Sequence, residues 1–549
     1  MTGSAAIARI LKLEGVEQVF CFPLTPILEA LTEERIRPMV ARQERVAENM
    51  ADGFSRVSNG RKLGVVTVQQ SAGAENAFSG IAQAYTDSSP ILFLPGHPGR
   101  GQVGVSPTFD AVKNYTATTK WADTIPSASR IVDRMRRAFT LLRSGRPGPV
   151  MLEIPIDVAA EELTTPLDYH PAPRTRFGPD PDAIRDAVRV LLSAERPMLW
   201  AGQGVLYAEA SAELKEVAEL LAAPVMTTLM GKSAFPETHP LSLGTGSYSR
   251  TTMVLDYLER CDVLFAVGAS LTRTAFAPEI PPGKRIIHAT VDPRDLNKDH
   301  VADIPILGDA QLVLRQMADE IHRQSAAGSR ARRPGVEAHV AVVREKWLKR
   351  WAPKLRSDEV PINPYRVIGE LIKLLDPAKS IVTHDSGSPR DQLVPLYPAV
   401  TPRGYLGWGH STQLGFSLGA SMGAKLAAPD KTVVNVLGDT AFGMVGMDVE
   451  TAVREQIPIL TVLLNNGAMG NYERYIPKSI ARYRTKYLTG NYSDVARGLG
   501  AHAERVEQPG MIATALQRAL AANREGRPAL VEFMTREEPD MAIPGSETH

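Results

Sequence analysis

Short apolar runs rich in valine, isoleucine and leucine recur along most of the chain and alternate with amphipathic stretches. A strand buried inside a parallel sheet is apolar on both faces, whereas a helix repeats its apolar positions every three or four residues. Strands that alternate with helices predict parallel sheets covered by helices on both sides, so the expected fold class is α/β and doubly wound. The strands expected in the first part of the chain are 16–22, 65–68, 91–94 and 150–154, and the helices are 5–13, 43–55 and 75–85.

Two polar stretches divide these elements into three groups. The first, 165–181, is rich in proline and is expected to be a linker. The second, 324–337, is charged, and its arginines are expected to form a solvated connection rather than a binding patch. We therefore expect three doubly wound parallel-sheet domains, at 1–165, 181–325 and 355–549, with the first and third alike in element order. The strands expected in the second and third domains are 198–201, 225–228, 263–267, 286–291, 380–383, 432–437, 459–464 and 529–533.

Composition narrows the classes of function. The chain has 549 residues, and its net charge of +1 gives no electrostatic reason to expect nucleic acid or an anionic membrane as a partner. The two cysteines, Cys21 and Cys261, are too few for a disulfide framework or a zinc cluster, and both are expected in the core. No apolar run approaches the roughly 18 residues that span a bilayer, and the first residues lack the pattern of a secretion signal. We expect a large cytoplasmic enzyme.

The most informative segment is a predicted strand–helix–strand unit. Its first apolar strand ends in Gly438-Asp439, a helical stretch follows at 445–455, and the second strand ends in Asn465-Asn466. A right-handed crossover places such strands parallel and close together, so their carboxyl ends share the edge where open α/β sheets bind ligands. One carboxylate and one amide oxygen suit a Mg²⁺ ion that also carries phosphate. A helix-capping aspartate followed by an Asn-Asn turn would give the same pattern, and these signals alone leave both interpretations open.

The same segment resembles the fingerprint of the thiamine-diphosphate (ThDP) enzymes of the acetolactate synthase and 2-oxo-acid decarboxylase superfamily, which is Gly-Asp-Gly, a spacer and Asn-Asn. Thr440 stands in the third place of the triplet, and the 27 positions from Asp439 to Asn466 (466 − 439) fit the family spacing. The resemblance implies that Asp439, Asn466 and the main-chain carbonyl of Ala468 bind Mg²⁺. It further implies ThDP contacts at Ser386, Gly387, Gly438, Thr440, Ala441 and Met469.

A second match lies near the N-terminus. The segment 40–56 resembles the family segment that carries the activating glutamate, and Glu44 takes that position, with Gln43 where the family usually has histidine. A buried carboxyl beside the aminopyrimidine ring shares a proton with a ring nitrogen and favours the imino tautomer, which can then deprotonate the thiazolium ring. A lone glutamate in a helical stretch is normally a solvated residue, and the match over the whole segment reverses that interpretation.

Further matches fall in all three expected domains, so the resemblance covers essentially the whole chain. It implies that Asn76 contacts the cofactor, that Leu414 is the bulky side chain between its two rings, and that the Thr412 carbonyl accepts a hydrogen bond from the aminopyrimidine amine. Core filling is the alternative for Leu414. The resemblance also places Glu44 and the diphosphate site on different subunits, which implies a homodimer or homotetramer with active sites at the subunit interface. The matching segments are 70–90, 146–157, 288–309 and 407–420.

The groups that face the substrate are less clear. His97 lies where acetolactate synthases carry an active-site glutamine, and it could move protons on the bound substrate, with an exposed loop histidine as the alternative. Gln102 is a second candidate if that loop shifts. His410, close to the predicted cofactor contacts, ranks second among the histidines, and His384, at the end of a predicted strand, ranks third.

Three functions remain open. The first is a ThDP- and Mg²⁺-dependent decarboxylase or carboligase that acts on a small 2-oxo acid. The second is a ThDP-dependent lyase of a 2-hydroxyacyl-CoA or an acyloin, and the third is a silent regulatory paralogue, against which the intact Glu44, Asp439 and Asn466 argue. Relatives hold FAD or ADP in the central domain, and segment 267–273 matches neither pattern well enough to decide. Basic residues that could serve an acyl-CoA, or simply be exposed, are Arg474, Lys478, Arg482 and Arg484.

Overall fold

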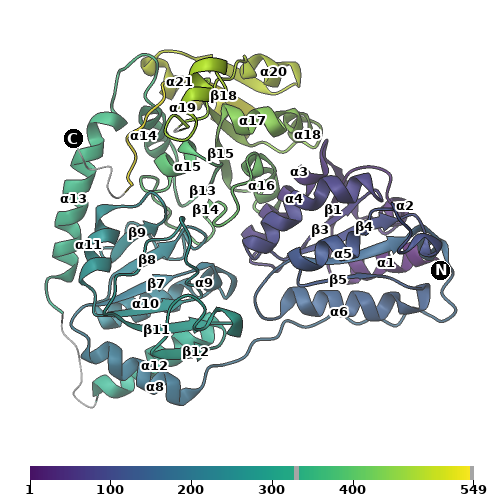
Figure 1. Ribbon diagram of the computed structural model, residues 1–549, viewed down its shortest axis with the longest axis horizontal. Helices are drawn as coiled ribbons and strands as arrows, with labels where there is room; N and C mark the ends of the chain where they lie inside the picture. Colours follow the sequence, from purple (N-terminus) through teal and green to yellow (C-terminus); the bar gives the residue numbers. More distant parts are fainter. Residues whose placement is uncertain (327–332, 471, 544–549) are drawn as a thin grey trace.

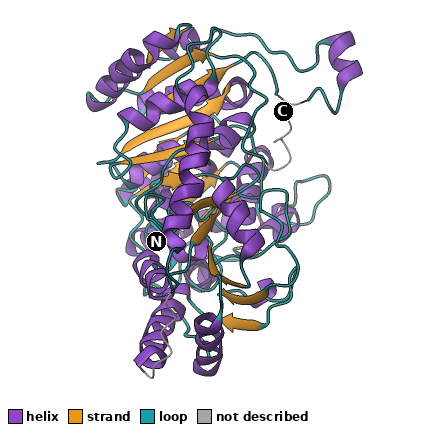
Figure 2. Ribbon diagram, turned by 90° about the vertical axis from the view of Figure 1, so that its left-hand side faces the viewer, coloured by secondary structure: helices purple, strands orange, loops and turns teal. Residues whose placement is uncertain are grey.

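The computed structural model describes residues 1–326, 333–470 and 472–543, and within them the chain forms three six-stranded sheets in which all paired strands are parallel. Helices lie on both faces of the strands (Figure 2), and the three sheets form the corners of a triangle (Figure 1). This arrangement confirms the expected α/β class. The domain limits 1–165, 181–325 and 355–549 stay predictions.

The N-terminal sheet has the strand order β2-β1-β3-β4-β6-β5. Its interior strands β3, β4 and β6 consist entirely of buried residues, as their apolar sequences require. The strands are β1 (Gln18–Cys21), β2 (Arg37–Val40), β3 (Gly64–Val68), β4 (Ile91–His97), β5 (Trp121–Thr124) and β6 (Val150–Pro155). The helices are α1 (Gly3–Leu13), α2 (Leu28–Glu33), α3 (Glu44–Val57), α4 (Ala72–Thr86), α5 (Ala111–Tyr115), α6 (Ile131–Arg143) and α7 (Ile156–Ala160).

The C-terminal sheet repeats this order strand for strand, as β14-β13-β15-β16-β18-β17, which confirms the expected likeness of the first and third units. The strands are β13 (Ser380–His384), β14 (Tyr405–Leu406), β15 (Thr432–Gly438), β16 (Leu460–Asn465), β17 (His502–Val506) and β18 (Ala529–Met534). The helices are α14 (Pro364–Leu374), α15 (Ser388–Leu393), α16 (Phe416–Ala427), α17 (Asp439–Val445), α18 (Val449–Arg454), α19 (Pro477–Tyr483), α20 (Tyr492–Gly498) and α21 (Ile512–Arg524).

The central sheet has a different order, β12-β11-β10-β7-β8-β9, which is that of a dinucleotide-binding fold. The strands are β7 (Pro197–Ala201), β8 (Val225–Thr228), β9 (Ser242–Gly246), β10 (Val263–Val267), β11 (Arg285–Thr290) and β12 (Ile304–Leu307). The helices are α8 (Pro181–Ser193), α9 (Gln203–Tyr207), α10 (Ser211–Leu221), α11 (Thr252–Arg260) and α12 (Ala310–Ala326).

Two expectations need correction. The helix predicted at 445–455 begins earlier, as α17, and is interrupted at Gly446–Asp448 before α18. The second linker, 324–337, lies partly outside the described residues. Its Arg333 is half-buried rather than freely solvated, because its guanidinium donates hydrogen bonds to carbonyls at the ends of α8 and α10. Beyond it, α13 (Val336–Leu355) runs along the outside of the molecule from the central to the C-terminal sheet (Figure 1).

The N-terminal and C-terminal sheets meet through α3 and α16, which occupy equivalent places in the two repeated topologies and lie side by side (Figure 1). Glycines permit their close approach. A Cβ atom added to Gly423 would lie 1.9 Å from the Met50 carbonyl oxygen, and one added to Gly53 would lie 2.1 Å from that of Ala420. One continuous core therefore spans both sheets and includes Met50 and Phe416.

Other expectations concern single residues and the membrane. Cys21 and Cys261 are buried and not in a disulfide, as expected of small core residues. Of the helices that the structure describes, none is long and apolar enough to cross a membrane.

Candidate active site

The predicted cofactor motifs converge where the order of the C-terminal sheet changes direction. In that sheet β13 and β15 are neighbours, although β14 lies between them in the sequence. Open α/β sheets bind ligands in the crevice at the carboxyl ends of such strands. Ser386 and Gly387 follow β13. Gly438 ends β15 and Asp439 follows it, and Asn465 ends the adjacent β16 with Asn466 directly after it. The repeated topology therefore brings the three loops to one edge.

Asp439 and Asn466 lie on neighbouring loops at this edge. The Asp439 carboxylate is 3% exposed and accepts hydrogen bonds from the backbone N–H of Gly467, at 2.8 Å, and of Thr440, at 2.7 Å. Asn466 Oδ1 accepts the N–H of Ala468 at 3.0 Å, which orders the loop. Burial raises the pKa of Asp439, and a bound cation would offset that effect. A carboxylate, an amide oxygen and a backbone carbonyl form the oxygen set that suits Mg²⁺ with a diphosphate.

The two asparagines at the end of β16 have different surroundings. Asn465 is buried, and its amide donates to Glu532 of β18 at 2.7 Å, so it connects two strands of the sheet. Asn466 is half-buried and faces the loop. The predicted contacts Thr440, Ala441 and Met469 lie on the same turns, and the Met469 N–H donates to the Lys486 carbonyl. Of the pair, Asn466 is thus the one placed to reach a ligand.

Residues 407–415 form the cofactor segment, which leads from β14 into α16 and contains Thr412 and Leu414. Thr412 is exposed, and Leu414 is half-buried against the core shared by the two sheets. Between them lies Gln413, and within the described residues neither polar atom of its amide has a hydrogen-bond partner, although both are shielded from solvent. An orphaned amide in this place fits a polar heterocycle bound beside the segment.

Glu44 is the first residue of α3 and lies at the end of the α3–α16 contact that faces these loops. It is 7% exposed, and the Asn76 amide points at its carboxylate, with 3.4 Å between Nδ2 and Oε2. The preceding Gln43 donates to the carbonyl of Met444, in α17, at 3.2 Å. Within one chain, therefore, Glu44 and the helix α17, which begins at Asp439, lie on opposite sides of the contact between the N-terminal and C-terminal units.

The three candidate histidines lie in different surroundings. His97 ends β4, is 5% exposed and accepts the Gly99 N–H at 3.1 Å, while Gln102 is exposed. His384 is fully buried beside the Tyr405 hydroxyl, at 2.9 Å. His410 is half-buried and lines a cavity of the central unit. Burial lowers the pKa of all three, so each is a neutral imidazole near pH 7. His97 and His384 each end a strand, at the carboxyl edge of its sheet.

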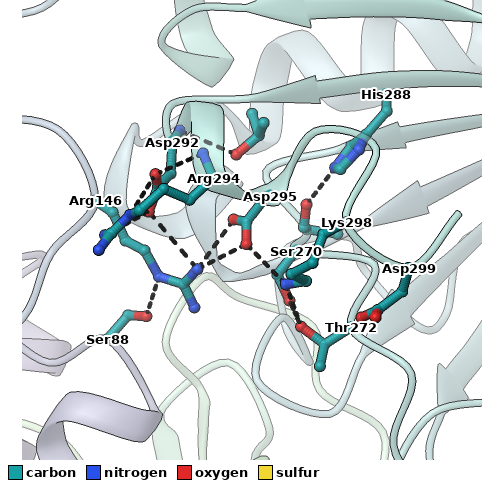
Figure 3. A network of polar contacts seen from close by, with 12 residues as sticks. Ser88, Arg146, Ser270, Thr272, His288, Asp292, Arg294, Asp295, Lys298 and Asp299 are labelled. Carbon is teal, nitrogen blue, oxygen red and sulfur yellow. Dashed lines mark hydrogen bonds and ion pairs between the residues drawn. The ribbon is translucent and has the colours of Figure 1, made fainter. Parts of the chain in front are cut away.

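That cavity, of about 180 Å³, lies at the switch point of the central sheet, between β7 and β10. Arg146 enters it from the N-terminal unit, donates to Asp295 at 2.9 Å and to Ser88 at 2.8 Å, and faces Asp292 (Figure 3). Lys298 contacts the same Asp295 at 3.0 Å. The strand order of the central sheet is that of folds that bind nucleotides, and the network connects two of the three units.

Two buried acids of the site were not predicted as functional. Asp385 is fully buried, accepts the N–H of Gly415 at 3.0 Å and the Ser417 hydroxyl at 2.6 Å, and so joins the β13 loop to the start of α16. Glu48, one helical turn beyond Glu44, is also fully buried, and its pKa lies well above the usual value because of burial and the nearby Glu44. In the sequence, the one sign of a role for Glu48 is its spacing of four positions from Glu44, which places the two on the same face of a helix.

Comparisons with known proteins agree with this geometry. Models of the thiamine pyrophosphate enzymes match the chain in three places: the N-terminal TPP binding domain at 1–120, the central domain at 184–317 and the C-terminal TPP binding domain at 385–533. The chain is 30% identical, over 568 residues, to the acetolactate synthase isozyme 3 large subunit of Escherichia coli, covering 100% of this chain and 96% of that protein.

Two further similarities extend over nearly the whole chain. The acetolactate synthase large subunit of Corynebacterium glutamicum is 30% identical over 567 residues, which cover 98% of this chain and 87% of that protein. A solved structure from Mycobacterium smegmatis, described as a thiamin diphosphate-dependent enzyme, superposes with a TM-score of 0.81 at 24% identity and covers 98% of this chain and 100% of that one. The three-sheet arrangement is thus shared with a known fold.

Proposed function

The chain belongs to the thiamine-diphosphate enzymes of the acetolactate synthase superfamily, and we propose that it is a Mg²⁺-dependent decarboxylase or carboligase whose donor substrate is a small 2-oxo acid. The observation that carries the proposal is the convergence of a buried Glu44, the cofactor segment and the Asp439–Asn466 loops on one interface. Bound ThDP supplies an electron sink for breaking or making a carbon–carbon bond next to a carbonyl.

The chain's own residues would bind and orient that cofactor. Asp439, Asn466 and the Ala468 carbonyl would hold Mg²⁺ and through it the diphosphate. Leu414 would keep the two rings bent, and the Thr412 carbonyl would accept a hydrogen bond from the amine. Glu44 would hold a proton at the pyrimidine nitrogen in a site that excludes water. His97 is the first candidate for moving a proton at the substrate, followed by His410.

A lyase that acts on a 2-hydroxyacyl-CoA is the second candidate, and one feature favours it. Arg474, Lys478, Arg482 and Arg484 are all exposed on the segment that follows the Asn-Asn loop. This segment returns to that loop, where the Leu488 N–H donates to the Gly467 carbonyl at 2.8 Å. Exposed cations beside the active site would suit the phosphates of coenzyme A. The alternative is a solvated surface, and a silent paralogue is disfavoured because Glu44, Asp439 and Asn466 are all present.

One experiment separates these candidates. Purified protein with ThDP and Mg²⁺ is incubated with a panel of 2-oxo acids and 2-hydroxyacyl-CoAs, and the products are identified by mass spectrometry. We expect turnover of a 2-oxo acid. Turnover of the CoA esters alone would favour the lyase, and an absence of turnover with every member of the panel would contradict both. Denaturing the purified protein and identifying any nucleotide that is released would show whether the central cavity holds FAD or ADP.

A further inference from the structure

Three fully buried charged side chains lie where the three sheets meet. Arg56 and Asp52 belong to α3, and Asp87 follows α4; their exposed fractions are 0%, 1% and 3%. Arg56 pairs with Asp52 at 2.8 Å and with Asp87 at 3.6 Å. Burying three charges lowers the stability of the fold unless each charge is hydrogen-bonded. The hydrogen-bond partners of Asp87 therefore indicate what the cluster does.

Those partners lie in the cofactor segment of the C-terminal unit. Asp87 Oδ1 accepts the backbone N–H of Gly409 at 3.1 Å and of His410 at 3.0 Å, and Arg56 donates to the Gly407 carbonyl at 2.6 Å. The third unit contributes as well, because the Gln203 amide donates to the Asp87 backbone carbonyl at 3.0 Å. Asp87 is therefore bonded to the central and the C-terminal units at once.

Elsewhere the segment is held by the buried Trp408 side chain and by the Gly415 N–H, which donates to Asp385. None of residues 407–415, all of which the structure describes, lies in a helix or a strand. Hydrogen bonds to a buried charged group are stronger than those between neutral groups, so two of them fix the backbone at Gly409 and His410. Thr412 and Leu414 follow within a few residues. The same α3 that carries Arg56 begins with Glu44 at its other end.

We propose that Asp87 and Arg56 are positioning residues, which fix the backbone of the cofactor segment on α3 and thereby place Thr412 and Leu414. The Asp52–Arg56 pair fixes a cation on α3, and that cation holds the Asp87 carboxylate in place. Asp87 in turn accepts the backbone N–H groups of the opposing unit. Neither residue touches the cofactor. The inference rests on the proposed function for the roles of Thr412, Leu414 and Glu44, but the hydrogen bonds themselves do not depend on it.

The first test needs no variant. Hydrogen–deuterium exchange of the intact wild-type protein without cofactor should show peptides over Gly409 and His410 protected to the same degree as α3, although the segment is irregular. Free exchange of these two amides would overturn the proposal. This measurement is independent of activity, so it holds even if the protein proves not to bind ThDP.

The second test uses the variant Asp87→Asn, with Arg37→Gln as the matched control. Arg37→Gln removes another ion pair between the same two units, Arg37–Glu455 at 2.7 Å, far from the cofactor segment in sequence. In Asp87→Asn we expect deuterium uptake to rise about tenfold in rate over 407–414 alone, and the affinity for ThDP measured by calorimetry to fall by about tenfold or more. Arg37→Gln should change neither.

Three outcomes decide the matter. Faster exchange together with weaker ThDP binding supports the proposal. Unchanged ThDP affinity and an unchanged circular-dichroism signal of the bound cofactor, despite faster exchange, would overturn the positioning role and leave the proposed function standing. If Asp87→Asn unfolds, Arg56→Lys keeps the charge but loses the two-way fork, and the same local rise in exchange is expected of it.

Discussion

Glu44 can be tested without disturbing its surroundings, because glutamine has nearly the same shape and keeps an acceptor for the Asn76 amide. We expect Glu44→Gln to leave ThDP binding largely intact and to lower turnover by roughly 10²- to 10⁴-fold, the range typical for loss of a positioned acid or base. Steady-state kinetics and calorimetry check the two parts. Glu75→Gln, on the exposed first turn of α4, is the control. Unchanged turnover in Glu44→Gln would remove this carboxyl from the mechanism.

Asp439 is expected to act at the binding step. Asp439→Ala removes the one carboxylate among the proposed Mg²⁺ ligands and leaves the Gly467 N–H without its acceptor. We expect Mg²⁺-dependent ThDP binding to be abolished in calorimetric titrations. Asp430→Ala, at an exposed position of the same unit, should bind as the wild type does. Equal ThDP affinity in the two variants would place the metal elsewhere.

Asp448 gives the fold a dependence on pH. It accepts the N–H of Arg42 at 2.8 Å across the α3–α16 interface, and burial raises its pKa to about 6 from 3.8. Below about pH 4 the Asp448 carboxyl is protonated in both the folded and the unfolded chain. As the pH rises toward 6, the unfolded chain releases this proton more readily than the folded chain does, so the free energy of unfolding falls. Relative to Asp448→Asn, the free energy of unfolding should fall by up to about 3 kcal/mol between pH 4 and 7, measured by urea denaturation. A constant difference would contradict this.

Single residues also mark the limit of prediction from sequence. Glu44, Asp439 and Asn466 could be proposed as site residues because each lies in a local sequence motif. The roles of Asp385 and Asp87 depend on backbone N–H groups of the cofactor segment that lies 322 positions from Asp87, and only the folded chain shows these partners. Burial of Glu48 likewise follows from the packing of α4 against α3, where Gly80 leaves room for its carboxyl.

Among the elements, the strands inside each sheet were predictable and those at its edges were not. Each predicted strand is one of the four interior strands of a sheet, whose two faces are both covered and whose sequences are therefore apolar throughout. The unpredicted strands are the pairs of edges: β2 and β5, β9 and β12, β14 and β17. An edge strand has one neighbour and accepts polar residues, so β17, His-Ala-Glu-Arg-Val, shows no apolar run. The edge strand β12, Ile-Pro-Ile-Leu, is apolar, but it is short and contains a proline.

The helix α13 was missed for a related reason. It is rich in charge, and only Val340, Trp347 and Trp351 are buried. Their spacing of seven and four positions lies on one helical face, which packs on α11 and α14. The periodicity was present, but the surrounding lysines and arginines make the segment look like a continuation of the linker.

The α3–α16 contact predicts a large effect from one methyl group. Gly423→Ala would bring a Cβ atom within 1.9 Å of the Met50 carbonyl oxygen, so the two helices must separate. We expect the free energy of unfolding to fall by about 1–3 kcal/mol in denaturant titrations. At Gly498, where an added Cβ meets no atom within 4 Å, the same substitution should be neutral or slightly stabilising. Equal effects at both positions would show that the helices tolerate a wider spacing.

For the whole molecule, the open question is how many chains build one site. The family resemblance implies that Glu44 acts on a cofactor held by a neighbouring subunit, whereas the α3–α16 contact exists within a single chain. Mixing inactive Glu44→Gln and Asp439→Ala chains, after unfolding and refolding together, distinguishes these arrangements. If subunits share sites, each mixed dimer holds one intact pair and up to about half of the wild-type activity per dimer returns. We expect this recovery, together with a dimer or tetramer in light scattering.

Failure of the mixture to regain activity would identify the contact within one chain as the catalytic pair. In that case each variant would carry one damaged half in every site, whatever the number of subunits. Either result leaves the binding predictions for Glu44→Gln and Asp439→Ala unchanged, since those are measured on single variants.

The N-terminal and C-terminal sheets share one strand order, and the helices through which they meet, α3 and α16, occupy equivalent places in it. The single chain therefore contains a contact of the isologous type, in which the same element of two like units meets its counterpart, as in a symmetric dimer. Its two sides nevertheless differ in chemistry, because the carboxyl of Glu44 belongs to one unit and that of Asp439 to the other.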